Sequence, residues 1–218
     1  MVLQLSGLTF GGIRCGAPAS MTSFRITPMA AADLPEVVRL QTAFLQGSVV
    51  TELGPRFLSR FHEVALSHPA SCAFAAHADR TLVGFALGSL DVHAFNDYVK
   101  PRVLLAMAMA LLSPARMRLA ASLVRMAFES EPEPQIPAEL LLLVVHPQAR
   151  RGGVGRGLLS ALEDVFAQHR HTRYRVAVRS QLTAARAFYE ALRFEPEQDR
   201  IVLGLPMTYL TKPLDGQV

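Results

Sequence analysis

Cysteine and lysine are scarce in this sequence, and tryptophan is absent. Among its 218 residues there are two cysteines, Cys15 and Cys72, and neither lies in a CxxC or a His/Cys spacing typical of metal sites. Two cysteines are too few for a disulfide framework. We therefore expect a protein of the reducing cytoplasm that uses no metal. Only Lys100 and Lys212 among the 22 basic residues are lysine, a bias to which we assign no function.

Charge of either sign is also low. Charged residues make up 18% of the chain, the net charge is +4, and no run of like charges occurs. Nucleic-acid binding needs a basic patch or stripe, so we expect no nucleic-acid partner. The low charge likewise gives no sign of a polyanionic substrate.

Long hydrophobic runs are lacking as well. Residues 103–112 are wholly apolar, but a helix that spans a bilayer needs about 20 apolar residues. The first 20 residues lack the basic segment and long apolar core of a signal peptide. We interpret residues 1–20 as a loose extension, with Met21 as an alternative natural start.

The rest of the chain is long and apolar enough for one domain. Residues 21–218 are predicted to form a single domain that contains a helical insertion at about 94–136. Within the insertion, Ser113-Pro114 separates two apolar helices, at residues 103–112 and 117–128. These helices either pack on the domain or contact a membrane surface or a partner, for which Met-rich, Arg-flanked helices are suited.

The spacing of apolar residues predicts the order of strands and helices. The first half is expected to form a strand, two helices and a hairpin, at residues 24–27, 30–45, 54–68, 71–77 and 82–90. The second half alternates strand and helix, at residues 139–145, 153–169, 174–178, 183–192 and 200–209. This alternation implies a locally parallel pair of strands, and the apolar run at residues 140–145 is typical of a strand buried on both faces.

A segment rich in glycine and arginine follows the buried strand and opens the next helix. Between Val145 and Leu158 it contains Arg150, Arg151, Gly152, Gly153, Gly155, Arg156 and Gly157. Glycine permits a left-handed backbone and a close approach of the main chain, so successive N–H groups can point at an anion. The start of a helix adds unpaired N–H groups and the positive end of its dipole. The segment therefore predicts a diphosphate site.

Two other phosphate loops do not fit this segment. A Walker loop needs Lys and then Ser or Thr after its last glycine, but Gly157 is followed by Leu158-Leu159. A dinucleotide GxGxxG pattern needs Gly or Ala at its last position, where this chain has Leu158 or Ser160, and the next strand ends in basic residues instead of an acidic one. A tight strand-to-helix turn without a ligand is the remaining alternative.

The pattern Arg150-x-x-Gly153-x-Gly155 resembles the acetyl-CoA signature of the GNAT acyltransferase superfamily. The resemblance covers residues 24–209 in element order and is sharpest over 138–196. It implies an α+β fold with α/β/α layers, in which a mixed, mostly antiparallel sheet has a splayed parallel pair of strands around the CoA site. The strand is expected to bulge at Val145. The implied acetyl-CoA-binding residues are Leu143, Val144, Val145, Arg150, Arg151, Gly152, Gly153, Val154, Gly155 and Arg156.

The resemblance also implies two catalytic residues. Tyr189 stands where the family's tyrosine protonates the thiolate of CoA, in the block Leu182-x-x-Ala185-x-x-x-Tyr189-x-x-x-x-Phe194. A core aromatic is the alternative, because the block has helical spacing. Glu139 lies six residues before Val145, where several members carry a general base. An ordinary solvated glutamate at the start of a strand is the alternative.

Two positions depart from the family pattern. Leu182 stands where the family usually has Asn, which puts one polar contact to the cofactor in doubt. Arg193 stands where the family usually has Gly, which suggests a less tight exit from the helix.

The resemblance places Glu52, Asp91 and His93 on the acceptor side of such a fold, as substrate-binding residues. We expect an N-acetyltransferase that transfers the acetyl group directly from acetyl-CoA to a primary amine of an amino sugar, amino acid or polyamine, or of a protein. The alternative is a CoA-binding interaction or regulatory protein whose helical insertion contacts a membrane or a partner. The expected partners are acetyl-CoA and the amine, membrane contact is not expected, and a homodimer is left open.

Overall fold

The structure is a computed structural model that describes residues 23–111, 135–202 and 205–214. The extension at 1–20 and the second helix of the insertion, at 117–128, lie outside these ranges. One seven-stranded sheet runs through the described part, in the order β1-β2-β3-β4-β5-β7-β6. Its strands are Arg25–Pro28 (β1), Ser71–Ala78 (β2), Thr81–Ser89 (β3), Glu139–Val145 (β4), Arg173–Arg179 (β5), Glu195–Val202 (β6) and Leu205–Pro213 (β7).

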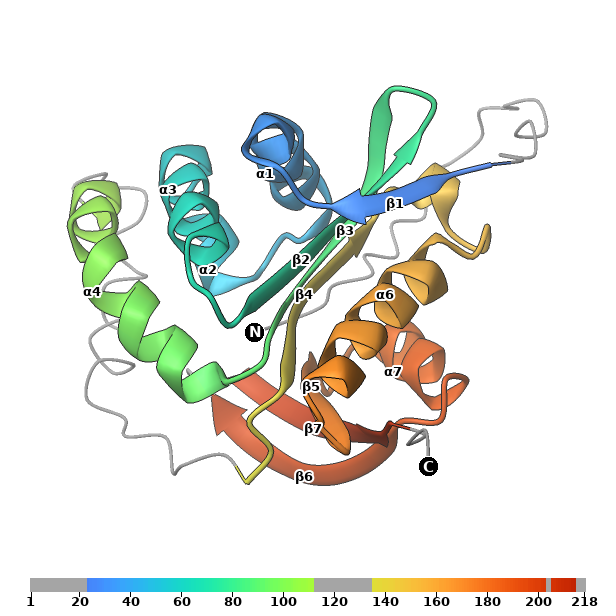
Figure 1. Ribbon diagram of the computed structural model, residues 1–218. Coiled ribbons are helices and arrows are strands. Elements are labelled where there is room, and N and C mark those ends of the chain that lie inside the picture. Colours follow the sequence, from blue (N-terminus) through green and yellow to red (C-terminus); the bar gives the residue numbers. More distant parts are fainter. Residues whose placement is uncertain (1–22, 112–134, 203–204, 215–218) are drawn as a thin grey trace.

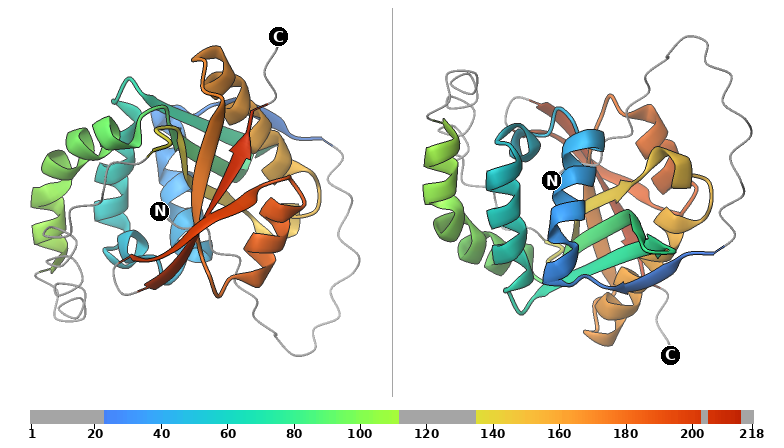
Figure 2. Two further views of the ribbon diagram at one scale, coloured as in Figure 1. Left: turned by 90° about the horizontal axis from the view of Figure 1, so that it is seen from below. Right: turned by 90° about the horizontal axis from the view of Figure 1, so that it is seen from above.

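Helices cover the sheet on both faces (Figure 1). Leu34–Phe44 (α1), Val49–Glu52 (α2), Pro55–Leu66 (α3) and Val92–Leu111 (α4) lie on one side; Val154–Gln168 (α6) and Thr183–Glu190 (α7) lie on the other. Two large apolar cores result, one between β2–β4 and helices α1, α3 and α4, the other between the sheet and helices α6 and α7. A third, small cluster on the last strands contains Ala177, Met207 and Tyr209. Figure 2 shows the same layers from below and above. The layered, mixed α+β fold predicted from the sequence is confirmed.

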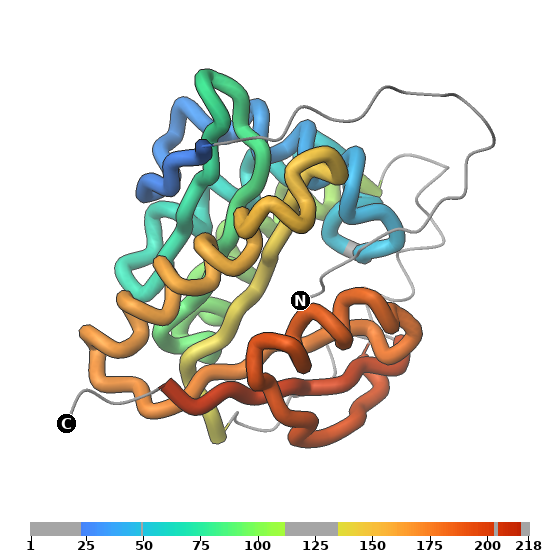
Figure 3. The backbone as a smooth tube through the Cα atoms, turned by 90° about the vertical axis from the view of Figure 1, so that its right-hand side faces the viewer, coloured from blue at the N-terminus to red at the C-terminus, as the bar shows by residue number. Residues whose placement is uncertain are grey.

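β4 and β5 form the parallel pair that the strand and helix order predicts. They are paired only through Glu139 with Arg175 and Leu140 with Val176. Beyond Val176, β5 continues along β7 instead, while β4 continues along β3. The two strands therefore separate at their C-terminal halves, and Figure 3 shows the last lobe of the chain, in red and orange, diverging from the yellow β4.

A β-bulge lies at the point where the two strands separate. The register of β4 with β3 passes from Leu142 to Leu140, so Leu141 is the extra residue. As a consequence, Leu141 and Leu142 both belong to the core under α1 and α4, whereas Leu140 and Leu143 belong to the core under α6. The bulge expected at Val145 is thus four residues earlier in the strand, because Val145 is regularly paired with Gly84.

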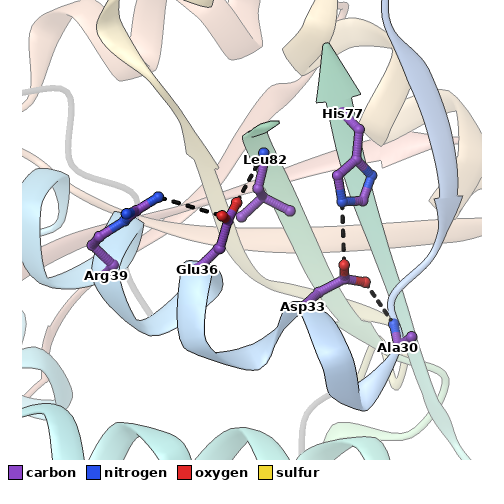
Figure 4. A network of polar contacts seen from close by, with 6 residues as sticks. All are labelled: Ala30, Asp33, Glu36, Arg39, His77 and Leu82. Atoms are coloured by element: carbon purple, nitrogen blue, oxygen red, sulfur yellow. Dashed lines mark hydrogen bonds and ion pairs between the residues drawn. The ribbon is translucent and has the colours of Figure 1, made fainter. Parts of the chain in front are cut away.

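The first turn of α1 holds the β2–β3 hairpin (Figure 4). Asp33 accepts the Ala30 N–H at 2.8 Å and contacts His77 of β2 at 3.2 Å. Glu36 accepts the Leu82 N–H at the start of β3, at 3.0 Å, and lies 3.5 Å from Arg39. The start of β3 pairs with the end of β4, so these contacts support the edge of the sheet where the glycine-rich segment begins.

A buried polar chain fixes the short helix α2, which the apolar spacing did not predict. His62 of α3 contacts Gln41 of α1 at 2.7 Å, and the Gln41 amide donates to Thr51 of α2 at 3.3 Å. Burial lowers the pKa of His62 to about 4, so its ring is neutral at physiological pH. The chain ties three helices together and positions Glu52, the next residue of α2.

One predicted strand is wrong. The strand predicted at 200–209 is a hairpin, because the chain reverses between Val202 and Leu205 of β6 and β7; Gly204 and Pro206 are the turn signals inside this apolar run. The insertion predicted from about 94 begins as α4 at Val92 and continues through Pro101. The Asp91 carboxylate accepts the N–H groups of His93 and Ala94, at 2.9 and 3.0 Å, and so caps this earlier start.

Candidate active site

The open edge of β4 presents main-chain groups to the gap between β4 and β5. The His146 N–H donates to the Val83 carbonyl of β3 at 2.8 Å. Because main-chain groups alternate in direction along a strand, the N–H and C=O of Val144 also face β3, and those of Leu143 and Val145 face the gap. In agreement, a Cβ at Gly84 of β3 would lie 3.0 Å from the Val144 oxygen.

The glycine-rich segment forms a turn that exposes the start of α6. After the 3-10 helix Pro147–Ala149, Arg151 and Gly153 adopt left-handed φ values of 62° and 84°. Gly153 precedes α6, and no side chain caps this helix. The N–H groups of Val154, Gly155 and Arg156 therefore have no partner within the helix, and the positive end of the helix dipole is left without a carboxylate.

Close packing fixes the position of this helix start. A Cβ at Gly157 would lie 2.7 Å from Cδ1 of Ile26 in β1, so a larger residue would displace the end of that side chain. A Cβ at Gly155 would lie 3.2 Å from the Phe188 ring of α7 and 3.7 Å from Val145. The start of α6, the end of β4 and helix α7 therefore meet at one place.

The three arginines of the loop differ in their surroundings. Arg150 is partly buried, its Nε donates to the Val145 carbonyl at 3.3 Å, and burial lowers its pKa. This bond closes the loop onto the end of β4. Arg151 and Arg156 are exposed on either side of the helix start, where their charge adds to that of the N–H groups. His146 packs edge-on against Phe44 of α1, with 5.0 Å between ring centroids.

Tyr189 lies in α7, one residue beyond Phe188. Its side chain is fully buried, and its ring packs against Phe188 and Phe194 at centroid distances of 5.3 and 4.9 Å. The hydroxyl has no hydrogen-bond partner among the described residues, and burial raises its pKa. A buried hydroxyl without a partner costs about 1–3 kcal/mol. Such a group suits a site that a bound substrate completes.

The ends of α7 show what the two departures from the family pattern do. Leu182 precedes the helix, and no side chain caps its first turn, as expected where leucine replaces a polar residue. Arg193 adopts a left-handed φ of 65°, the conformation that glycine favours. The less tight exit suggested by Arg193 is therefore wrong: the chain keeps the tight turn and places an arginine in it.

Glu139 is buried in an ion pair at the closed end of the gap. Its Oε2 atom lies 2.8 Å from Nε and 2.7 Å from a terminal nitrogen of Arg175, and both side chains are less than a tenth exposed. The Arg175 guanidinium also lies over the Tyr209 ring, 4.9 Å from its centroid. Arg175 was not among the residues predicted from the sequence; its signal is the spacing of Arg173, Arg175 and Arg179 along β5.

The three residues expected on the acceptor side are not brought together. Glu52 accepts the Gly47 N–H at 3.1 Å, in the connection between α1 and α2. Asp91 caps α4, and His93 is an exposed residue 3.3 Å from Asp97. Because Ser89 of β3 pairs with Glu139, Asp91 and His93 lie at the opposite end of β4 from the glycine-rich loop, about 20 Å away along the strand.

The described residues fit acetyl-CoA at three points: the uncapped start of α6, the main chain of Leu143 and Val145, and the Tyr189 hydroxyl. In the same ranges, no group of three or more His, Cys, Asp or Glu side chains is arranged to hold a metal ion. Nor is any helix of the described part long and apolar enough to cross a membrane.

A mixed sheet that splays beside an uncapped helix start defines the class of acyl-CoA-dependent acyltransferases. The family model for the acetyltransferase (GNAT) family matches residues 34–194. The chain therefore belongs to the GNAT acetyltransferase family and is an acyltransferase that uses acetyl-CoA and an acceptor. No curated protein matches the sequence.

Solved structures support the same fold. The chain is similar to the ribosomal-protein-S18-alanine N-acetyltransferase from Escherichia coli, at 16% identity and a TM-score of 0.57, over 90% of this chain and 96% of that one. It is also similar to the PaiA N-acetyltransferase from Thermoplasma acidophilum in complex with coenzyme A, at 16% identity and a TM-score of 0.57, over 88% and 99%. SsHAT matches at 20% identity and a TM-score of 0.61, over 88% and 98%. At these identities the likeness shows the fold alone.

Proposed function

We propose that this acetyltransferase is an N-acetyltransferase that transfers the acetyl group of acetyl-CoA directly to a primary amine. The observation that carries this proposal is the buried Tyr189 hydroxyl, which has no partner among the described residues and belongs to the helix whose Phe188 approaches Gly155 and Val145. The amine nitrogen forms a bond to the thioester carbonyl carbon as the C–S bond breaks, and the proton that the nitrogen gives up passes to water. Tyr189 supplies the proton that the departing thiolate takes up.

The same proposal gives the loop and β4 their roles in binding the donor. The N–H groups of the loop from Arg150 to Arg156 hold the pyrophosphate at the uncapped start of α6, with charge from Arg151 and Arg156. The main chain of Leu143 and Val145 pairs with the pantetheine arm, as a strand would. Cofactor binding by Gly152, Gly153, Val154 and Gly155 follows through their main chain, whereas the main-chain groups of Val144 face β3 and leave it a supporting position in the strand.

For Glu139, the pairing with Arg175 favours a structural role over that of a base. The carboxylate oxygen of Glu139 forms an ion pair with the Arg175 guanidinium at 2.7 Å. This pair links β4 to β5 where the two strands are paired. If Glu139 were the base, Glu139→Gln would lower kcat about 100-fold or more and remove a limb of the pH profile. As a clamp, it should change the stability and leave the shape of the pH profile unaltered.

The acceptor is a small amine, such as an amino sugar, amino acid or polyamine, or a protein amine. Two of the similar structures are named for the acetylation of ribosomal-protein alanine, so short peptides with a free amino terminus belong in the acceptor panel. Purified protein with acetyl-CoA and this panel should release free CoA, measured with a thiol reagent. No release above the rate without amine would contradict the proposal.

A partner surface on α4 is a second proposed function, beside the transferase activity. Leu104, Leu105 and Met109 are 57, 75 and 62% exposed on this helix. If this surface of α4 binds another copy of the chain, sedimentation should show a concentration-dependent dimer that Leu105→Glu weakens.

We also propose that residues 21–218 form one domain, with α4 as the described part of its insertion. The expected cytoplasmic location stays a prediction.

A further inference from the structure

One face of the β5–β7–β6 part of the sheet carries several arginines. Arg179 of β5 and Arg200 of β6 are both directly opposite Met207 of β7, and Ala177 is opposite Tyr209. Directly opposed residues of antiparallel strands have their side chains on the same face. The other face of these strands, with Val176, Val178 and Leu210, is packed under α6 and α7. The arginines therefore point away from those two helices.

The charges on this face are only partly compensated. Arg175 is neutralised by Glu139 at 2.7 Å. Arg200 lies over the Tyr209 ring, 5.8 Å from its centroid, and Arg175 lies over the same ring. Neither Arg179 nor Arg200 has an ion pair with a carboxylate of the described residues. Two positively charged guanidinium groups, one on β5 and one on β6, thus flank Met207 of β7.

The location of this face relates it to the acceptor. β5 borders the gap between β4 and β5 beyond Val176, and Arg179 ends the strand along that edge. α6 and α7 cover the opposite face, and α6 opens at the donor loop, so the face of Tyr209 is turned away from these helices. Figure 2 shows this part of the sheet in the view from below. On this face Ala177, Met207 and Tyr209 are buried in a small apolar cluster. Arg179 and Arg200 are only half-buried beside it, so they are the groups of this face that a ligand in the gap can reach.

We propose that Arg179 and Arg200 bind an anionic group of the acceptor, so that the preferred substrates are amines that also carry a carboxylate or a phosphate. The inference rests on the proposed N-acetyltransferase activity and names its class of acceptor. A guanidinium offers paired N–H donors that match the oxygens of either anion. The buried ring of Tyr209, which the guanidinium groups of both Arg175 and Arg200 overlie, limits the movement of Arg200. The low overall charge of the chain hid this local pair.

The test uses matched amines that differ only in the anionic group. The pairs are 5-aminopentanoate with pentylamine, glucosamine 6-phosphate with glucosamine, and a short peptide with an internal Glu or Gln and an amidated carboxyl end. Release of CoA from the full chain gives kcat/KM for each. The anionic member should be preferred about tenfold or more, as expected for a hydrogen bond to a charged group. The carboxylate and phosphate pairs show which anion is recognised.

Arg179→Gln and Arg200→Gln should each lower that preference, mainly through KM, and leave the Kd of CoA unchanged. Arg80→Gln removes the same charge at the exposed turn between β2 and β3 and should leave the preference intact. An equal or better rate with the neutral members, or a preference that survives both substitutions, would overturn the inference.

A binding measurement separates this inference from the proposed function. The same amines are titrated calorimetrically into the protein with CoA bound. Binding of the anionic members that both arginine variants lose supports the anionic subsite even if no amine is acetylated, a result that would overturn the proposed function alone. Equal binding of charged and neutral members, or binding that the variants keep, overturns the subsite.

Discussion

The two ends of β4 contribute polar groups of different kinds. At the Val145 end they belong to the main chain: the edge of the strand and the uncapped start of α6. At the Glu139 end they are side-chain charges, paired at 2.7 Å and nearly buried. A main-chain site depends on backbone conformation and tolerates many side chains. A buried ion pair depends on both partners, and so a single change there should have the larger effect.

Arg175→Met is the strongest test of that contrast. Removal of one partner of a buried ion pair destabilises a protein by about 3–5 kcal/mol. The free energy of unfolding, measured with urea, should fall by this amount. In the double variant Glu139→Met/Arg175→Met both charges are gone, and its stability should return to within about 1 kcal/mol of the original. A single variant as stable as the original would show that the pair is not needed.

The sequence predicted the main-chain end of β4 better than the charged end. Glycines and arginines at fixed spacing behind an apolar strand are local signals, so the loop at Gly153 and the strand Glu139–Val145 follow from the sequence. The pair of Glu139 with Arg175 joins residues 36 apart in the chain. It depends on the register of two parallel strands, which no local pattern reveals. The contacts of the Tyr209 ring with Arg175 and Arg200 also depend on how the strands are paired, so no local pattern reveals them either.

The fold was predictable to a similar degree. The buried run of β4 and the helical spacing of α6 were unambiguous, whereas α2 has only four residues and is held by the buried contact between Gln41 and Thr51. The bulge at Leu141 shifts a strand by one residue within an all-apolar run. Leucine suits both faces there, so the sequence carries no trace of the shift.

Tyr189→Phe tests α7, the helix that approaches the Val145 end through Phe188. Loss of the proton donor should lower kcat about 100-fold, within the range typical of general acids. The hydroxyl has no partner among the described residues, so its removal should raise the free energy of unfolding without CoA, by up to about 1 kcal/mol. Steady-state rates and urea titrations give both values. A normal kcat would remove Tyr189 from the acid role.

Gly153→Ala tests the dependence of the loop on backbone conformation. Alanine at a φ of 84° costs about 1–2 kcal/mol, and a shifted turn misaligns the N–H groups of α6. The strained loop should relax to a conformation that binds CoA less well. The Kd of CoA, measured by calorimetry, should therefore rise about tenfold. Gly54→Ala is a control at another helix start, because Gly54 precedes α3 at a φ of 89° and a ψ of 174°. This conformation is almost exclusive to glycine, so the control should cost at least as much stability and leave the Kd unchanged. Equal effects of both variants on CoA would contradict a specific role of the loop.

Arg193→Gly should have the smallest effect, and of opposite sign. Arg193 adopts a left-handed φ of 65° where the chain leaves α7, and Arg170 adopts 62° where it leaves α6. Glycine adopts this conformation without the clash of a Cβ, although it also gives the unfolded chain more freedom, so each replacement should stabilise the protein by about 0.5–1 kcal/mol. Thermal unfolding of both variants measures the gain. Because the effect arises from the backbone, Arg170→Gly and Arg193→Gly should gain alike, with kcat unchanged. A gain at Arg170 alone would mean that the Arg193 side chain makes a contribution of its own to the turn beside Tyr189.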